Sequence, residues 1–263
     1  MMLRRYDYAL DLSDSGRAKL WIVLSVARIR GINDAYHSVG WERQFFNRVS
    51  LFKWRSEHQV LRDFRTVAEV MGLEGEPGPL RFYPQASPQS LYGILPADAA
   101  YAVIHPASRW AFKQWLPERW AAVADRLSRE HALRVIFSCG PDEREKTMVQ
   151  EILARSEEKH SSTDGELSLD EFGVLLKGAK VFLGVDTVAM HLAAAMQTRV
   201  VALFGPSSEW SWQPWQCRHE LVLGDCPCKR SRRFACDKTK PYPCMERITV
   251  NEVLEKTRTL LLR

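Results

Sequence analysis

The sequence predicts an α/β fold built on a doubly wound parallel sheet, and the prediction is clearest in the second part of the chain. From about residue 100 onward, short apolar stretches alternate with helical stretches, which is the pattern of parallel strands joined by crossover helices. Helix-start signals, either a proline or a Ser/Thr-x-x-Glu capping box, precede several of the helical stretches. The 263 residues also suffice to bury the core of one large or two small domains.

The first predicted strand of this part is 101–105 (YAVIH). Pro117 suits the first position of the helix that follows, because a helix leaves that N–H unpaired in any case. A β-branched strand at 133–140 (LRVIFSCG) ends at Gly140, and a charged amphipathic helix is expected over 142–158.

Ser168 and Glu171 form a capping box that opens the next helix, which Gly178 is expected to close. The remaining elements are expected in this order: a strand at 181–185, a helix at 188–196, a strand at 199–205, a long loop, and a last helix opened by the capping box of Thr249 and Glu252. Strands spaced by helices of this length need right-handed crossovers, so we expect a parallel sheet covered on both faces.

The first part of the chain has fewer elements: a strand at 8–12, a helix at 17–29 and a longer amphipathic helix at 58–73. Residues 75–90, rich in Pro, Gly and Gln, are expected to be a linker. We therefore divide the chain into a partial N-terminal α/β domain with its linker, residues 1–92, and a complete α/β domain, residues 93–263. The last helix is expected to pack back toward the N-terminal part.

Composition and charge exclude several classes of protein. No apolar run approaches the roughly 20 residues of a membrane-spanning helix, and the first residues lack the long apolar segment of a secretory signal, so we expect a cytoplasmic protein. Much of the net charge of +5 lies in residues 228–240. That stretch is either a solvated loop or a surface that meets phosphorylated sugars or anionic lipids. No pattern of a nucleic-acid-binding module accompanies it.

Four of the six cysteines follow one another as Cys226-x-Cys228-x7-Cys236-x7-Cys244. The spacing lacks the paired CxxC of structural zinc sites, so no metal is expected. A cytoplasmic location also argues against disulfides. The sequence assigns no role to these four cysteines.

Polar residues directly after the strand at 101–105 form a first candidate site, since ligands of a doubly wound sheet bind beyond the carboxyl ends of the strands. Ser108, Arg109 and Lys113 occur there with no acidic residue among them. A hydroxyl, a guanidinium and an ammonium suit a phosphate or a diphosphate. The plainer alternative is a surface loop whose tryptophans pack on the body of the domain.

The junction at 184–196 (GVDTVAMHLAAAM) offers a second set of polar groups at a strand end. A helix N-terminus attracts anions, Thr187 is able to donate its hydroxyl there, and Asp186 is able to accept from sugar hydroxyls. His191 is expected on the same face of the helix, although a lone histidine in an apolar helix is more often a core residue. Glu143, near the start of its own helix, either favours the helix dipole or binds the hydroxyls of a ribose.

Three common motifs are absent from the sequence. No two glycines are separated by a single residue, so GxGxxG is absent, and neither the GxxxxGKS/T of P-loop proteins nor GxSxG occurs. These absences argue against a nicotinamide-dependent oxidoreductase, a P-loop phosphotransferase and an α/β hydrolase.

Taken in order, the motifs HPASRWAFKQWLPERWAAVADRL, CGPDERE, LSLDEF and GVDTVAMHLAAAMQTRVVALFGPSS resemble the donor-binding half of the bacterial lipopolysaccharide heptosyltransferases, glycosyltransferase family 9. The HPxSRWxFKxW run is most similar to the heptosyltransferase III subgroup. The resemblance covers about residues 6–263. It implies a GT-B fold of two Rossmann-like domains. It also implies an inverting, metal-independent transfer of heptose from ADP-L-glycero-β-D-manno-heptose to a lipid-linked core oligosaccharide at the cytoplasmic face of the inner membrane.

The resemblance implies roles for single residues and needs no cofactor besides the donor. Two residues would be catalytic: Lys113, which stabilises charge on the leaving ADP, and Asp186, which binds heptose hydroxyls. The donor-binding residues it implies are Ser108, Arg109 and Lys113 at the diphosphate, Glu143 at the ribose, Leu167 beside the adenine, Asp186 at the heptose, Thr187 at the pyrophosphate, and His191 on the same wall.

The sequence departs from the family pattern at two places. Val188 stands where many members have a glycine after the Asp-Thr pair. The sequence also begins after the family's first strand and glycine-containing loop, whose aspartate is thought to act as general base; Asp11 and Asp14 match a different position. Two hypotheses follow, an active heptosyltransferase or a truncated, catalytically weak remnant that binds the ADP-sugar. The sequence indicates neither the acceptor hydroxyl nor the oligomeric state.

Overall fold

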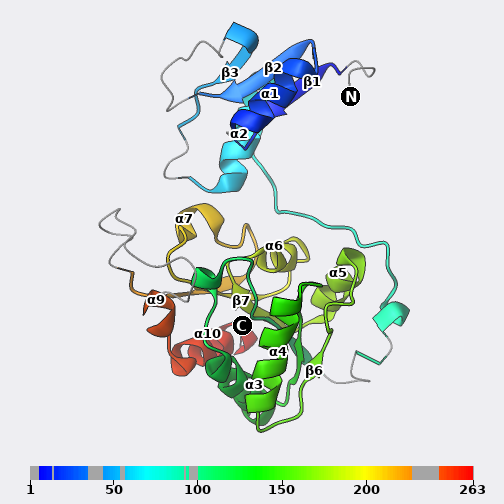
Figure 1. The fold of residues 1–263 in the computed structure, drawn as a ribbon, viewed down its shortest axis with the longest axis vertical. Helices are drawn as coiled ribbons and strands as arrows, with labels where there is room; N and C mark the ends of the chain where they lie inside the picture. The colour runs from blue at the N-terminus through cyan, green and yellow to red at the C-terminus, as the bar shows by residue number, and fades with distance from the viewer. Residues whose placement is uncertain are drawn as a thin grey trace. The chain divides into compact units, whose positions relative to one another are not determined.

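The computed structural model describes residues 6–13, 15–34, 44–53, 57–91, 93–94, 100–226 and 243–262. The chain divides into two compact units, residues 1–78 and residues 79–263. Figure 1 draws the first unit in blue to cyan and the second in the colours that follow.

The boundary between the units lies before the predicted one at residues 92 and 93, because the segment after Gly78 packs on the second unit. Phe82 packs on an apolar cluster of that unit. The backbone N–H of Gln85 donates to Asp170 Oδ1 at 3.1 Å, and Leu91 is fully buried. Part of the predicted linker is thus a component of the second unit.

In its described residues, the first unit consists of a three-stranded parallel sheet and two helices. Its elements are β1 (Tyr8–Asp11), α1 (Gly16–Leu24), β2 (Ile29–Asn33), β3 (Arg48–Ser50) and α2 (Gln59–Met71), and the strand order is β1-β2-β3. The helix predicted over 17–29 was wrong in its second half, since it ends at Leu24 and Ile29 begins β2. The Ser25 hydroxyl donates to the carbonyl of Ile22 at 2.6 Å, and Val26 has a positive φ of 52°, so the chain turns there.

The second unit is a doubly wound α/β domain, as the sequence predicts. Its strands are β4 (Tyr101–His105), β5 (Arg134–Phe137), β6 (Ser161–Ser162), β7 (Val181–Val185), β8 (Val200–Phe204) and β9 (His219–Leu223). They form a single sheet in the order β6-β5-β4-β7-β8-β9 with parallel pairing throughout. The direction of winding reverses between β4 and β7, the place where such folds bind ligands.

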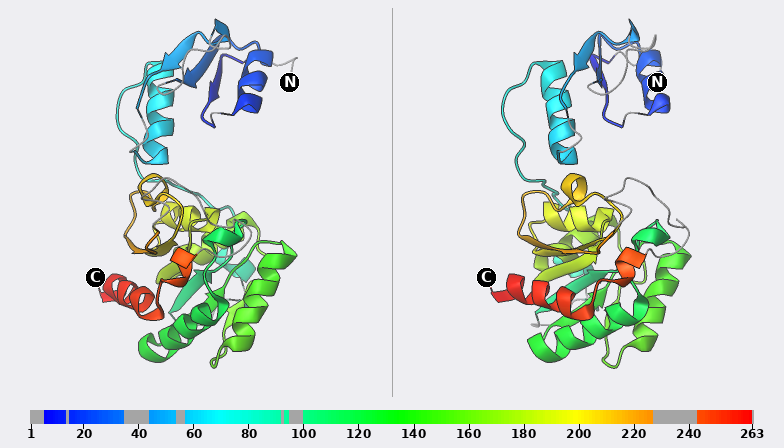
Figure 2. Two further views of the ribbon diagram at one scale, coloured as in Figure 1. Left: turned by 60° about the vertical axis from the view of Figure 1, so that its left-hand side comes forward. Right: turned by 90° about the vertical axis from the view of Figure 1, so that its left-hand side faces the viewer.

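Helices cover both faces of this sheet. They are the 3₁₀ helices η2 (Pro88–Leu91) and η3 (Ala111–Lys113) and the α-helices α3 (Pro117–His131), α4 (Glu143–Arg155), α5 (Leu169–Gly178), α6 (Val188–Ala195), α7 (Glu209–Trp212), α9 (Pro243–Glu246) and α10 (Val250–Leu262). Buried side chains of α3, α4 and α10 form one apolar cluster with the sheet, and those of α5 and α6 form a second. In Figure 2, α10 (red) lies on the opposite side of the sheet from α6 (yellow-green).

Both predicted capping boxes are present. The Ser168 N–H donates to Glu171 Oε2 at 2.9 Å, and the Thr249 N–H donates to Glu252 Oε2 at 2.7 Å. Gly178 is the last residue of α5, so the helix ends where the sequence predicts, although this glycine has no positive φ. A Cβ at this position would lie 2.3 Å from the hydroxyl of Tyr101, so the glycine permits a close approach of β4.

The structure adds strands to the predicted set in both units: β2 and β3 in the first unit, and β6 and β9 in the second. Strand β9 lies within the region predicted to be a long loop. The last helix, α10, packs on β9 and α3 of its own unit. Its packing toward the N-terminal part stays a prediction.

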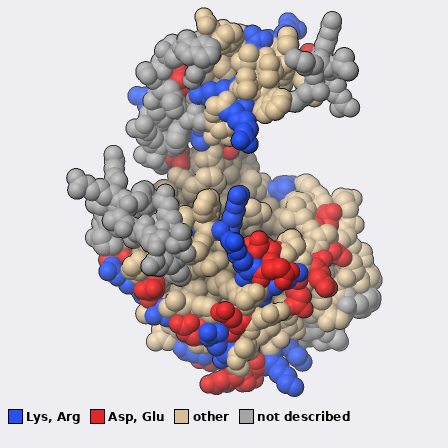
Figure 3. All heavy atoms as spheres, in the orientation of Figure 1, with Lys and Arg blue, Asp and Glu red and all other residues tan. Residues whose placement is uncertain are grey.

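Acidic and basic side chains are interspersed over α3 and α4 on the face seen in Figure 3. On α3, for example, Arg129 pairs with Glu157 and Glu158, each at 2.7 Å, and all three side chains are exposed. Exposed ion pairs contribute little to stability, so this face is an ordinary solvated helix surface.

Residues 228–240, with Cys228 and Cys236, lie outside the described residues, as does Asp14. In the part of the chain that is described, no helix has both the length and the apolar character needed to cross a membrane.

Candidate functional site

A cavity of about 580 Å³ opens at the carboxyl ends of β4, β5 and β7, where the direction of winding reverses. Its lining residues fall within 105–113, 139–145, 163–172 and 186–192, with Trp212 in addition, and all belong to the second unit. The volume is that of a typical small-molecule site.

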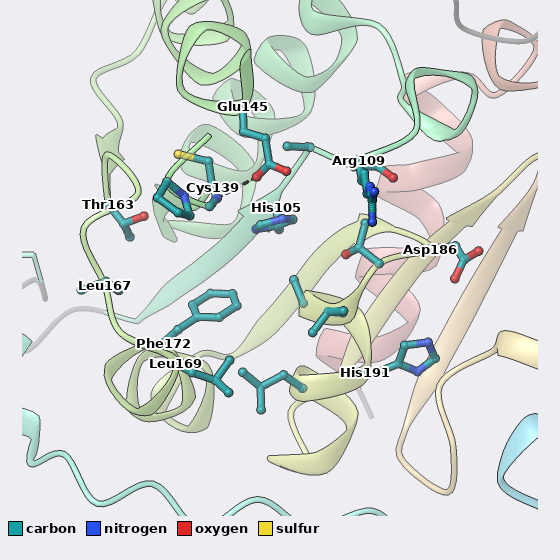
Figure 4. A pocket seen from close by; sticks show the side chains of 18 of the residues that line it. His105, Arg109, Cys139, Glu145, Thr163, Leu167, Leu169, Phe172, Asp186 and His191 are labelled. Atoms are coloured by element: carbon teal, nitrogen blue, oxygen red, sulfur yellow. Dashed lines mark hydrogen bonds between the residues drawn. The ribbon is translucent and has the colours of Figure 1, made fainter. Parts of the chain in front are cut away.

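The two ends of this cavity differ in character. In Figure 4, Arg109, Asp186 and His191 lie toward one end, whereas Leu167 and Phe172 lie toward the other. A ligand that fits both ends therefore combines a polar or anionic part with a flat apolar part.

Lys113 and Asp186 meet at the polar end, although they are far apart in the sequence. Lys113 ends the 3₁₀ turn η3 after β4, and Asp186 follows β7. The Lys113 Nζ lies 2.6 Å from Asp186 Oδ2, with the two side chains 21% and 6% exposed. The basic loop and the strand tip predicted separately thus share one cavity.

The loop that carries Lys113 is held by its own hydrogen bonds. Ser108 is buried; its hydroxyl accepts from the N–H of Trp110 at 3.3 Å, and its carbonyl accepts from Gln114 Nε2 at 2.9 Å. The guanidinium of Arg109 lies 5.8 Å from the centre of the Trp110 ring, in the range of a cation–π contact. The loop therefore presents two positive groups, Arg109 and Lys113, to the cavity.

Thr187 precedes the first turn of α6 and has an extended backbone. Its hydroxyl oxygen is buried and has no hydrogen-bond partner among the described residues. The first N–H groups of a helix also lack partners within the helix, and the helix dipole places partial positive charge there. A hydrogen-bonding anion bound at this point would satisfy both, whereas an unsatisfied buried hydroxyl costs about 1–3 kcal/mol.

His191 lies one turn further along α6 and also lines the cavity. Its ring lies 6.1 Å from that of Trp212 at an angle of 63°. The histidine is thus a wall of the polar end rather than a residue of the apolar core.

The apolar end is formed by the segment that leads into α5. Leu167 and Phe172 line it, and the Phe172 ring lies 6.0 Å from the ring of His105. Burial lowers the pKa of His105 from 6.5 to about 4, and its Nδ1 lies 3.0 Å from the Ser138 hydroxyl. The imidazole is therefore neutral near neutral pH and adds no charge to this part of the cavity.

The structure places Glu145, and not the predicted Glu143, in the lining of this cavity. Glu143 is the first residue of α4, its side chain is 84% exposed, and it pairs with Lys146 at 2.8 Å outside the cavity. Glu145, in the third position of the helix, turns back toward β5 and accepts from the Gly140 N–H at 2.7 Å. Figure 4 shows its side chain in the cavity.

The other seven predicted site residues share the cavity: Ser108, Arg109, Lys113, Leu167, Asp186, Thr187 and His191. Sequence reasoning missed Glu145, Phe172 and Trp212. Asp142 caps α4 through the Arg144 N–H at 2.8 Å. An acid three residues after such a cap points back to the preceding loop, which is the signal that identifies Glu145. Within the described ranges, no group of three or more His, Cys, Asp or Glu side chains is placed to hold a metal ion.

Residues 2–242 match the sequence profile of glycosyltransferase family 9 (heptosyltransferase). A lipopolysaccharide heptosyltransferase 3 from Escherichia coli is 28% identical over 218 residues, which cover 80% of this chain and 63% of that protein. The chain thus spans less than two thirds of the length of this relative.

Solved structures of a family 9 glycosyltransferase and of a heptosyltransferase have the same fold as this chain. A glycosyltransferase of family 9 from Veillonella parvula superimposes with a TM-score of 0.78 at 21% identity, covering 98% of this chain and 74% of that one. The E. coli heptosyltransferase WaaC with ADP-2-deoxy-2-fluoro heptose gives a TM-score of 0.67 at 19% identity, with 98% and 73% covered. The chain therefore has the GT-B architecture of these enzymes.

Proposed function

Since this chain belongs to glycosyltransferase family 9, the heptosyltransferases, we propose that it transfers heptose from ADP-L-glycero-β-D-manno-heptose to the inner core of lipopolysaccharide. The observation that carries the proposal is that Lys113, Asp186 and Thr187 face one cavity whose opposite end is apolar. The name of its E. coli relative, a lipopolysaccharide heptosyltransferase 3, supports the acceptor, and the ligand described with WaaC supports the donor.

The donor fits the cavity in one direction. The adenine lies at the apolar end against Phe172 and Leu167, and the carboxylate of Glu145 accepts from the ribose hydroxyls. The diphosphate then reaches Arg109 and Lys113, whose charges neutralise it.

Thr187 and the N-terminus of α6 complete the diphosphate site. The buried Thr187 hydroxyl donates to a phosphate oxygen, and the first N–H groups of the helix point at the same anion. Val188, which stands where many members of the family have a glycine, lines the cavity with its side chain 75% exposed. Beyond the diphosphate, Asp186 accepts hydrogen bonds from the heptose hydroxyls.

The transfer is an inverting displacement at the anomeric carbon of the heptose. The acceptor hydroxyl oxygen forms the new glycosidic bond and gives its proton to a general base, while the bond between the anomeric carbon and the β-phosphate oxygen breaks and ADP leaves. Negative charge grows on that phosphate oxygen in the transition state. The Lys113 ammonium, held 2.6 Å from Asp186, is positioned to stabilise this charge without a metal ion.

A lipid-linked core oligosaccharide as acceptor places the reaction at the cytoplasmic face of the inner membrane. Residues 228–240 suit contact with phosphorylated sugars or anionic lipids, since they contain Lys229, Arg230, Arg232, Arg233, Lys238 and Lys240 against the single acid Asp237. Reversing the charge of Arg232 and Arg233 should reduce co-sedimentation with anionic vesicles at low salt. An unchanged partition would remove this part of the proposal.

A transfer assay tests the proposal as a whole. Incubation with ADP-heptose and a deacylated core acceptor should add one heptose to the acceptor, detected by mass spectrometry. Lys113→Met should lower the rate by about 100-fold or more, because a preorganised charge at the leaving group is lost. Lys256→Met is the matched control, since Lys256 pairs with Glu220 at 3.0 Å outside the cavity and its loss should leave transfer unchanged.

The possible failures of this assay have different meanings. Binding of ADP-heptose without transfer would favour the catalytically weak remnant. A chain that binds neither ADP nor ADP-heptose would overturn the assignment of the cavity, and binding of NAD in their place would indicate an oxidoreductase.

A further inference from the structure

Trp212 lies at the polar end of the cavity and has no part in the function proposed above. It ends α7, the short helix after β8, and lines the cavity while its side chain stays 40% exposed. The tryptophans of the apolar core are much less exposed than Trp212. Trp115 and Trp120 are 1% and 0% exposed and pack edge to face at 4.9 Å. The open indole of Trp212 is therefore available to a ligand.

The position of Trp212 identifies the part of the ligand that it meets. Its ring contacts His191, and Figure 4 shows His191 at the end of the cavity away from Phe172 and Leu167. Arg109 and Asp186 lie on the same side as His191. An ADP-sugar with its adenine at Phe172 and its diphosphate at Lys113 therefore extends its sugar toward Trp212.

We propose that Trp212 is a sugar-binding residue that packs against the transferred sugar ring and selects the intact nucleotide sugar over free ADP. This inference rests on the proposed function, because it takes the direction of the donor from it. Trp212 and Asp186 divide the recognition between them: the indole takes an apolar face of the ring, and the carboxylate takes its hydroxyls.

The chemistry of the two surfaces supports this pairing. The face of an indole carries the negative part of its quadrupole, and it attracts the weakly positive C–H groups that line one face of a sugar ring. Covering that face also removes apolar surface from water. A diphosphate gains nothing from the same surface, so the contact favours the sugar alone.

Isothermal titration calorimetry with ADP and with ADP-heptose tests the inference on the full chain. Trp212→Leu keeps an apolar side chain and removes the aromatic face. It should raise the Kd for ADP-heptose about tenfold, which corresponds to about 1.4 kcal/mol, while the Kd for ADP stays within about twofold. Trp212→Phe should raise the Kd for ADP-heptose by a smaller factor, because it keeps an aromatic face. Trp210→Leu is the matched control, because Trp210 belongs to the same helix, is 69% exposed and does not line the cavity; both of its Kd values should stay unchanged.

Unchanged ADP binding in the Trp212→Leu variant also reports that the cavity is folded. An equal rise in both Kd values, or no rise in either, would overturn the inference, and so would an equal loss in the Trp210→Leu control. These results differ from a failure of the proposed function, in which the unsubstituted chain itself would bind neither ADP nor ADP-heptose.

Discussion

The two glutamates on the first turn of α4 show that a residue's position in a helix determines whether its side chain reaches the cavity. Glu145 turns into the cavity and Glu143 points to solvent. Glu145→Gln should weaken ADP binding about tenfold, because a neutral amide accepts more weakly from ribose hydroxyls than a carboxylate does. Glu143→Gln should leave binding unchanged. Calorimetry with ADP measures both affinities. A larger loss in Glu143→Gln than in Glu145→Gln would instead assign the ribose to Glu143.

The pH dependence of the protein's stability tests the environment of His105. Its folded pKa, about 4, is below the unfolded value of 6.5, so between these values the unfolded chain binds a proton that the folded protein does not. The contribution of His105 to stability is therefore fully present above about pH 6.5 and is lost as the pH falls toward 4. His105→Asn should make the midpoint of thermal unfolding fall less steeply over this window. Parallel slopes for the variant and the unsubstituted chain would contradict the burial of a neutral imidazole.

At this scale the sequence predicts residues that follow strand ends and misses residues that depend on side-chain direction. Lys113 and Asp186 could be predicted because parallel strands end at one edge. Phe172 and Trp212 could not, since an aromatic residue at a helix is more often in the core and only the folded cavity shows which ones line it. Glu143 and Glu145 both lie in the first turn of α4, and only the direction of each side chain, which the sequence does not give, distinguishes them.

At the scale of the elements, Gly178 allows α5 to pack closely against Tyr101 of β4. A Cβ there would lie 2.3 Å from the Tyr101 hydroxyl, which donates to the carbonyl of Leu175 at 2.8 Å. Gly178→Ala should therefore destabilise the protein by about 1–3 kcal/mol, since overpacking outweighs the better helix propensity of alanine. Urea denaturation measures the change. Adding Tyr101→Phe removes the clashing oxygen, so the double variant should lose less than the sum of the two single variants; simple additivity would contradict this explanation.

The elements themselves were largely predictable, for local reasons. Pro117 and the capping boxes at Ser168 and Thr249 are chemical signals carried by a few neighbouring residues. Strand β9 (HELVL) could not be predicted because two of its five residues are polar, and its identity depends on pairing with β8. The end of α1 was missed because the residues after Leu24 suit a helix, and only the turn at Ser25 and Val26 ends it.

On the scale of the whole molecule, the cavity belongs entirely to the second unit. Its lining residues all lie within 79–263, and that unit has its own apolar clusters on both faces of the sheet. The fragment 79–263 should therefore fold alone and bind ADP with a Kd within about threefold of that of the full chain. Circular dichroism checks the fold and calorimetry the affinity. A folded fragment without affinity for ADP would mean that the first unit supplies part of the site.

The proposed donor site is a single cavity that binds ADP at both of its ends. A crystal structure of the chain with ADP tests this most directly. We expect the diphosphate between Lys113 and the N-terminus of α6, with Thr187 Oγ1 within hydrogen-bond distance of a phosphate oxygen and the adenine against Phe172. A nucleotide bound outside the cavity, or bound in it with the adenine at Trp212, would contradict the account.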